Sequence, residues 1–142
     1  MQVEFFKVRP NAQIPKLATS GSVGFDFAAA ENIKIEPKQI SKIPTGISIA
    51  VPKGFALVLA SRSSAPKKFH LSPPHGIGII DQDFCGPKDE IQILVYNFSD
   101  FVVKIFAGDR IAQGIFVPVL LPKFIETNFS NKKNCGGFGS TG

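Results

Sequence analysis

Apolar residues along the chain fall into short runs that Gly, Pro or Asn residues separate. These runs are rich in β-branched and aromatic side chains, which are enriched in strands. The tripeptides at 33–35, 47–49 and 91–93 each alternate Ile, a polar residue and Ile, which is the period expected where one face of a strand is buried. The pattern predicts strands over residues 3–8, 24–28, 32–35, 46–51, 55–60, 90–96, 102–106 and 110–117.

Helix is nearly absent from the prediction. No window of eleven or more residues holds a helical period free of Pro and Gly, and one turn around residues 62–66 is the only helix expected. Many short strands with regular turn residues are typical of a sandwich, a jelly roll or a barrel. The 142 residues show no repeat and no change of composition, so they predict a single all-β domain.

Composition excludes several classes of protein. Hydrophobic residues make up 44% and charged residues 19%, which excludes a disordered or fibrous chain. No apolar run approaches the ~20 residues of a membrane span, and the N-terminus lacks the pattern of a signal peptide, so we expect a cytoplasmic protein without a membrane partner. Cys85 and Cys135 are too few for a disulfide scaffold, and neither they nor the two histidines have zinc-ligand spacing.

The net charge of +5 favours an anionic ligand. The basic residues are scattered, however, and only the lysine pairs at 67–68 and 132–133 are adjacent. The aromatic pattern of proteins that bind single-stranded nucleic acid is also missing. A small polyanion is therefore expected rather than a nucleic acid.

Three internal segments carry candidate chemistry, and each has a plainer alternative. Arg62 among serines suits phosphate oxygens, but a strand-end turn capped by serines has the same sequence. Asp81 follows an apolar run, where a catalytic carboxylate or an Asx-turn residue would both lie. Arg110 and Gln113 add donors at a strand start, and a surface hairpin would look the same.

The last segment, residues 129–142, is small and polar except for Phe129 and Phe138. Such a terminus is often frayed. Glycine-rich backbone can also wrap around an anion, and an isolated aromatic ring can cap a flat ligand. The segment is therefore either a frayed end or a functional arm.

In sequence order, five segments resemble the five motifs of the trimeric dUTPase (deoxyuridine triphosphatase) family. They are SVGFDFAA at 22–29, SRSS at 61–64, GIIDQDFCG at 78–86, GDRIAQ at 108–113 and GGFGSTG at 136–142. The resemblance spans nearly the whole chain, and the last motif matches almost letter for letter. It implies a jelly-roll-like β-clip domain over residues 1–128 and a flexible C-terminal arm over residues 129–142. It also implies a homotrimer with three active sites at the subunit interfaces.

The resemblance implies hydrolysis of dUTP to dUMP and pyrophosphate, which limits uracil incorporation into DNA and supplies dUMP for dTMP synthesis. Asp81 would orient and deprotonate the attacking water. Asp26 would orient Arg62 or a metal-bound water. Mg²⁺ would be held mainly through the substrate phosphates and water, with no direct protein ligand. The implied substrate-binding residues are Arg62, Ser63, Ser64, His75, Gly78, Ile80, Phe84, Arg110, Gln113, Lys133, Phe138, Gly139, Ser140 and Thr141.

Several positions depart from the family's usual residues. Phe84 replaces the Tyr that packs against the deoxyribose, and His75 stands where some members have Asn. Ser64 replaces Gly, Cys85 replaces a frequent Arg, and residues 87–89 are an insertion. Lys133 replaces the phosphate-binding Arg of the arm, which keeps the charge but loses the bidentate fork, so we expect weaker γ-phosphate affinity.

Two other functions fit parts of the sequence. A dCTP deaminase would share the fold and the Arg-Ser-Ser motif, but the position of its acid–base Glu is Leu94 here, which cannot move protons. A non-catalytic member that regulates by binding a nucleotide or a protein would not need Asp81, Arg62, Gln113 and Phe138.

Overall fold

The computed structural model describes residues 1–127 of the chain. Nearly all of its regular structure is β. The strands are β1 (Phe5–Lys7), β2 (Lys16–Leu17), β3 (Phe25–Ala28), β4 (Ile33–Ile35), β5 (Ile40–Pro44), β6 (Ile47–Ile49), β7 (Phe55–Ser61), β8 (Leu71–Ser72), β9 (Gly78–Ile80), β10 (Gln92–Asn97), β11 (Val103–Ile105) and β12 (Arg110–Pro118), with one helix, α1 (Ala65–Phe69).

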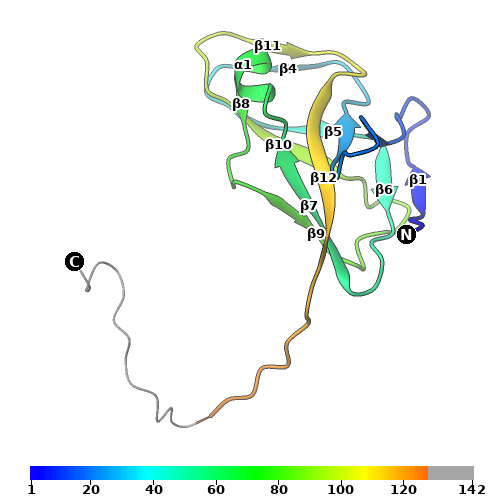
Figure 1. Cartoon of the computed structure of the whole chain (residues 1–142). Helices are drawn as coiled ribbons and strands as arrows, with labels where there is room; N and C mark the ends of the chain where they lie inside the picture. The colour runs from blue at the N-terminus through cyan, green and yellow to red at the C-terminus, as the bar shows by residue number, and fades with distance from the viewer. Residues whose placement is uncertain (128–142) are drawn as a thin grey trace.

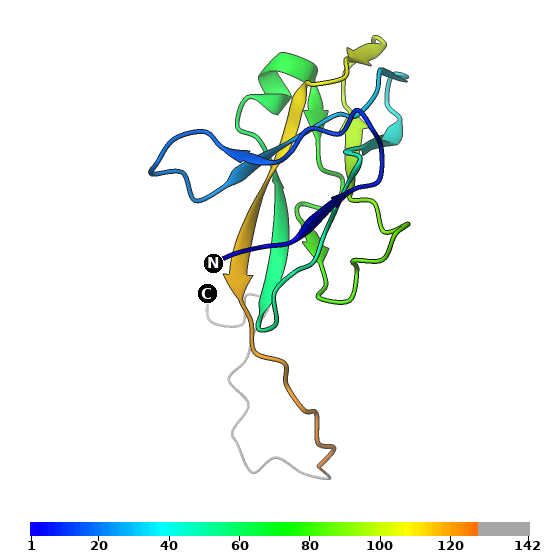
Figure 2. The same ribbon diagram turned by 90° about the vertical axis from the view of Figure 1, so that its right-hand side faces the viewer.

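A five-stranded sheet in the order β2-β3-β12-β7-β9 is the largest element of the fold. The remaining strands form the smaller sheets β5-β10-β8, β11-β4 and β1-β6, and every pair is antiparallel. The long strands β7 and β12 run side by side through the domain, and the smaller sheets are arranged around them (Figures 1 and 2). This architecture confirms the expected all-β, jelly-roll-like fold.

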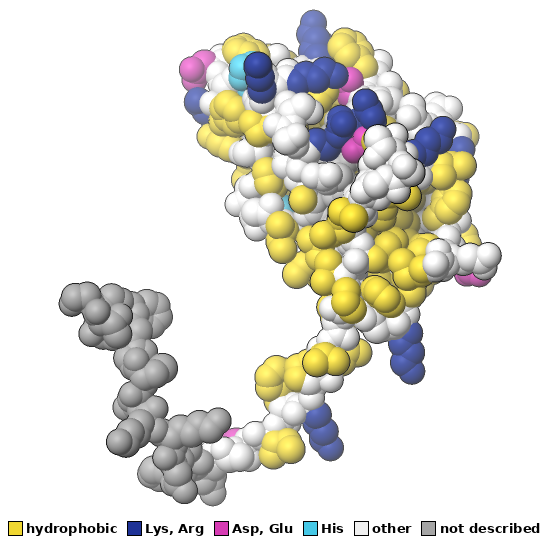
Figure 3. All heavy atoms as spheres, viewed as in Figure 1, with side chains coloured by type: hydrophobic (Ala, Val, Ile, Leu, Met, Phe, Trp, Pro, Cys, Tyr) yellow, Lys and Arg dark blue, Asp and Glu magenta, His cyan; other side chains and the backbone are white. Residues whose placement is uncertain are grey.

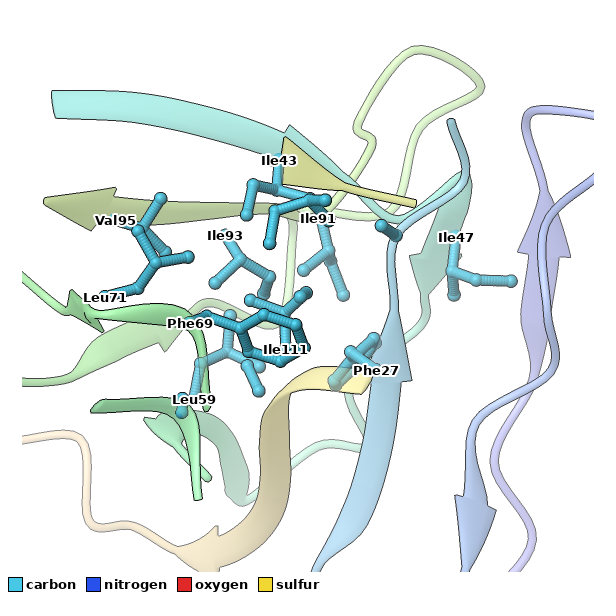
Figure 4. Packing of buried hydrophobic residues seen from close by; sticks show 14 of the residues in the cluster. Phe27, Ile43, Ile47, Leu59, Phe69, Leu71, Ile91, Ile93, Val95 and Ile111 are labelled. Carbon is cyan, nitrogen blue, oxygen red and sulfur yellow. The ribbon is translucent and has the colours of Figure 1, made fainter. Parts of the chain in front are cut away.

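One hydrophobic core joins these sheets. Side chains from β3, β5, β7, β10, β11 and β12, together with Phe69 of α1, point toward one another in its interior (Figure 4). Phe27, Ile43, Leu57 and Ile91 are at most 1% exposed. Burial of a side chain of this size contributes about 1.5–3 kcal/mol. The core thereby fixes the registers of β3, β7 and β12, on which the polar residues described below depend.

All eight predicted strands are present, with ends within about two residues of the predicted bounds. Strands β2, β5, β8 and β9 lie outside the predicted ranges. Strands β2, β8 and β9 are only two or three residues long, and β5 pairs over five residues with β10, which is distant in sequence. The helical turn begins at Ala65, within the predicted range 62–66, and continues past its end to Phe69. It has Pro66 in its first turn, where the missing N–H is tolerated, and it ends at His70 in the left-handed region at φ 53°.

One alternating pattern was misleading. Ser48 of β6 was expected on the polar face, but it is fully buried along with its Ile neighbours. Strand β1 lies beside β6 in the same sheet, with Phe6 opposite Ser48. The Ser48 hydroxyl has no hydrogen-bond partner within residues 1–127.

The N-terminal segment is fixed to the body by charged hydrogen bonds. Arg9 donates to the Glu90 carboxylate from Nε at 2.8 Å and from Nη2 at 3.1 Å, and a bond at 2.8 Å also joins it to Glu31. The backbone N–H of Gly46 donates to the same Glu90 carboxylate at 2.7 Å. The hydrogen bond to Glu90 raises the pKa of Arg9, and the nearby charge of Glu90 and Glu31 adds to this effect. Within residues 1–127, no helix has the length and hydrophobicity to cross a membrane.

Candidate active site

Polar side chains from adjacent strands line up on one face of the five-stranded sheet. Lys16 of β2 is opposite Asp26 of β3, Asp26 is opposite Gln113 of β12, and Gln113 is opposite Ala60 of β7. Directly opposite residues of antiparallel strands project from the same face. Arg62 follows two residues after Ala60 and reaches the same row. We call Lys16, Asp26, Arg62, Arg110 and Gln113 the polar row.

Two arginines share the carboxylate of Asp26. Arg62 Nε lies 2.9 Å from Asp26 Oδ1, and Arg110 Nη1 lies 3.0 Å from Asp26 Oδ2. The Asp26 side chain is 15% exposed, whereas those of Arg62 and Arg110 are 26% and 56% exposed. A register shift between Arg110 and Ala112 places Arg110 opposite Ala28 and lets it reach Asp26. Asp26 thus fixes two guanidinium groups that still face solvent.

Gln113 is oriented by one hydrogen bond, and the other end of its amide lies close to Gly24. Its Nε2 donates to the backbone carbonyl of Ser61 at 3.3 Å. Its Oε1 lies against Gly24, where an added Cβ would be 3.1 Å from this oxygen. A side chain at position 24 would therefore move the amide of Gln113.

The turn before β12 needs Gly108, whose φ of +92° lies in the region that favours glycine.

Ser63 and Ser64 lie at the start of α1, and both are exposed. Ser64 occupies the N-cap position without a side-chain capping bond in the described structure. Capping by serines was the plainer interpretation of this motif, and the Ser64 hydroxyl does not act in that way. Both hydroxyls lie one or two residues beyond Arg62 in the sequence.

An apolar pocket of about 240 Å³ lies beside the segment from β8 to β9. It brings together three sequence-predicted residues, His75, Gly78 and Ile80. Leu94 of β10 also lines it, so the position of a deaminase's acid–base Glu is apolar here. The other lining residues are Leu59, Ala60, Ser61, Ala65, Leu71, Ser72, Pro73, Ile77, Ile79, Gln92, Ile93, Val95, Ile111 and Ala112.

Asp81 follows β9 directly, next to this pocket. A turn begins there, with the Phe84 N–H donating to the Asp81 carbonyl at 3.3 Å. Asp81 is exposed, and the Phe84 ring is 37% exposed. The inserted residues 87–89 form a separate tight turn, in which Gly86 N–H donates to the Asp89 carboxylate at 2.7 Å. The insertion therefore closes on itself and leaves Asp81 accessible.

Asp81 and Arg62 lie toward opposite ends of β7. Ile80 is opposite Leu57, so Asp81 comes level with Ala56, whereas Arg62 follows the last residue of the strand. Arg62 is six positions after Ala56 in the sequence, which corresponds to about 20 Å at the usual rise of about 3.3 Å per residue. Asp81 and Arg62 of one chain therefore cannot contact the same phosphate group.

The remaining predicted site residues, Lys133, Phe138, Gly139, Ser140 and Thr141, lie outside the described residues. No group of three or more His, Cys, Asp or Glu side chains within residues 1–127 could hold a metal ion. Sequence reasoning missed Lys16 and Gly24 as members of this surface. Neither carries a local signal, because their positions follow from strand pairing.

Figure 3 shows basic side chains gathered around acidic ones on the upper part of one face, above an extensive apolar area. The polar row offers cations and amide donors to an anion. The pocket offers apolar walls to a flat group, with a carboxylate at its edge. These features define an all-β protein suited to a ligand that carries both phosphate and an apolar ring.

Comparisons with known proteins identify the family. The dUTPase family model matches residues 10–142. The deoxyuridine 5'-triphosphate nucleotidohydrolase of Helicobacter pylori (strain P12) is 35% identical, over 100% of this chain and 97% of the relative. The enzyme of the same name from Desulfitobacterium hafniense (strain DSM 10664 / DCB-2) is 41% identical, over 92% of this chain and 87% of the relative.

Solved structures agree with this match. The dUTPase of Streptococcus mutans is 30% identical with a TM-score of 0.78, over 87% of this chain and 100% of that one. The Staphylococcus bacteriophage 80alpha dUTPase with dUpNHpp is 24% identical with a TM-score of 0.86, over 99% and 98% of the two chains, and it supports the fold. This chain belongs to the dUTPase family, which confirms the resemblance seen in the sequence.

Proposed function

We propose that this chain hydrolyses dUTP to dUMP and pyrophosphate in a homotrimer whose active sites are shared between subunits. Its relatives in the dUTPase family are named for this reaction. One observation supports the proposal: residues of the four motif segments within residues 1–127 contribute to the polar row and to the apolar pocket, which we assign as half-sites for phosphate and for the base. Neither half-site alone contains both a water-activating carboxylate and a set of phosphate donors.

The polar row is the phosphate half-site. Arg62 and Arg110 offer guanidinium N–H donors, and Gln113 adds an amide. Charge-assisted bonds of this kind are about twice as strong as neutral ones, and they act where charge develops on the leaving pyrophosphate. Ser63 and Ser64 add hydroxyl donors at the adjoining turn. Asp26 acts through the arginines by holding their orientation.

The pocket is the base half-site. Its walls are mostly apolar, and the backbone of residues 71–78 offers N–H and C=O groups to the edge of uracil. His75, Gly78 and Ile80 line the space, and the half-exposed Phe84 ring follows beyond Asp81. Phe84 packs against the deoxyribose and leaves no room for a 2′-hydroxyl. Asp81 orients a water in line with the α-phosphate and accepts its proton.

Mg²⁺ fits this site as a partner of the substrate. Mg²⁺ keeps several waters and is usually bound through one or two carboxylates and substrate phosphates. Asp26 is the carboxylate of the polar row, and its two oxygens already accept bonds from arginines, so it would hold the ion through water. The bound ion would neutralise charge on the phosphate chain.

Two observations support an assembly of more than one chain, and the trimer is the form that the resemblance implies. The separation of Asp81 and Arg62 means that one chain cannot complete a site. The segment after β12 also exposes Leu120, Leu121, Phe124 and Ile125 by 77–95%. An apolar groove of about 210 Å³ is available for such side chains on the same fold. Exposed apolar surface of this extent marks an interface, and a second copy of the chain provides a matching groove.

Residues 129–142 complete the proposal as an arm that follows the domain of residues 1–128. Phe138 stacks on uracil, Lys133, Ser140 and Thr141 contact the outer phosphates, and Gly139 lets the backbone approach them. Deletion of the residues after Lys133 is expected to leave a folded trimer with little activity. Unchanged activity would show that this segment is only a frayed end.

A panel of nucleotides tests the reaction. With Mg²⁺ present, dUTP should release pyrophosphate, and dCTP, dTTP and UTP should release far less. Ammonia is measured in the same reactions, because its release from dCTP would indicate a deaminase. Equal turnover of all four nucleotides would contradict the proposal, and binding without turnover would favour a regulator.

A further inference from the structure

Lys16 lies beside the phosphate half-site, although it belongs to none of the five motif segments. Strand β2 pairs with β3 so that Lys16 is directly opposite Asp26. Opposite residues of an antiparallel pair have their Cβ atoms about 4.5–5.5 Å apart on the same face. Lys16 therefore extends the polar row by one strand beyond Asp26.

A cavity lies between Lys16 and Arg110. It measures about 250 Å³, and Lys16, Asp26, Arg110 and Gln13 supply its polar lining. Lys16 is exposed, and it forms no ion pair with another residue of the described chain. Both oxygens of Asp26 are bonded to Arg62 and Arg110, so the carboxylate opposite Lys16 is already shared.

The charges of the polar row, three of which line this cavity, do not balance. Lys16, Arg62 and Arg110 are cations, and Asp26 is the carboxylate between them, which leaves a formal charge of +2. Like charges held close together repel one another, and a polyanion placed among them relieves this repulsion. The polar row as a whole is therefore matched to a ligand with at least two negative charges.

We propose that Lys16 is a further substrate-binding residue that contacts the outer phosphates of the nucleotide. A lysine ammonium is a compact charge on a flexible stem and recognises charge rather than a fixed geometry. The outer phosphates carry most of the negative charge of a nucleoside triphosphate and leave as pyrophosphate. The inference rests on the proposed function for the identity of the nucleotide.

Binding measurements on the full chain test this role. Calorimetry measures the affinity of three probes: inorganic pyrophosphate, dUMP and the α,β-imido analogue of dUTP. The variants are Lys16→Ala and Lys16→Arg. Lys53→Ala serves as the matched control, because Lys53 is also exposed but precedes β7 at the end opposite Arg62.

Lys16→Ala should weaken the binding of pyrophosphate and of the analogue about tenfold, which is the scale of one charged hydrogen bond. The affinity for dUMP should not change. Lys16→Arg should restore most of the loss, and Lys53→Ala should bind all three probes as the wild type does. Wild-type affinities in Lys16→Ala, or an equal loss for dUMP, would overturn the inference. If the wild type binds pyrophosphate but neither dUMP nor the analogue, the proposed function fails, and the pyrophosphate data still decide the role of Lys16.

Discussion

Two inactive variants of this protein should restore activity to each other within one trimer. Asp81→Asn removes the carboxylate proposed to activate water, and Arg62→Ala removes a guanidinium from the phosphate half-site. These residues lie about 20 Å apart in one chain, six residues along β7 at about 3.3 Å each. Under the proposed function, each working site would need Asp81 from one subunit and Arg62 from another.

The size of the effect follows from the geometry. Loss of a general base costs about 10²–10⁴-fold in rate, and loss of one donor to developing charge costs about 10²–10³-fold. In a cyclic trimer that contains both variants, one neighbouring pair combines an intact Asp81 with an intact Arg62, so about one third of wild-type activity is expected. This value exceeds the activity of either parent by at least about tenfold.

The assay is pyrophosphate release from dUTP by mixed trimers, which are purified through two different tags after coexpression. Unmixed variants assayed together, without subunit exchange, should stay inactive. A double variant that carries both Asp81→Asn and Arg62→Ala should not complement either single variant. A mixed trimer of the double variant with a single variant has no intact copy of one of the two residues. If purified mixed trimers are no more active than their parents, the model of a site shared in this way is wrong.

Three further predictions concern stability, positioning and assembly. Glu90→Ala should lower the free energy of unfolding by about 1–3 kcal/mol, because a backbone N–H and a guanidinium lose their acceptor. Chemical denaturation measures this change, and the control Glu36→Ala, at an exposed position, should have little effect. Gly24→Ala should reduce kcat/KM for dUTP about tenfold by moving the neighbouring glutamine amide, whereas Gly21→Ala, with open space around its Cβ, should match the wild type. Phe124→Asp should shift the trimer toward monomers in sedimentation, and an unchanged trimer would exclude the exposed segment from the interface.

Strand positions could be predicted where the sequence itself carries the period. Ile33 and Ile35 face one side of β4, and Lys34 between them is exposed, as the alternation required. Strand β2 could not be predicted in this way, because two residues define no period and their pairing with β3 is a tertiary event. The burial of Ser48 was missed for a related reason, since local alternation does not show how β6 packs against the rest of the fold.

The candidate site was predictable in part. Motif order pointed to Asp26, Arg62 and Arg110, and the structure places their charged groups 2.9–3.0 Å apart. The contact of Arg110 with Asp26 depends on a bulge in β12, and no local sequence signal predicts this bulge. Lys16 was missed because its neighbours come from strand register rather than from its own segment.

The shared carboxylate of Asp26 has a thermodynamic consequence for binding. A free arginine side chain carries about 2 kcal/mol of rotamer entropy. Two arginines that are bonded to Asp26 lose much of this freedom during folding, so an arriving polyphosphate meets donors that are already ordered. In Asp26→Asn the ordering would occur on binding instead, and calorimetry would record it as a less favourable binding entropy for pyrophosphate.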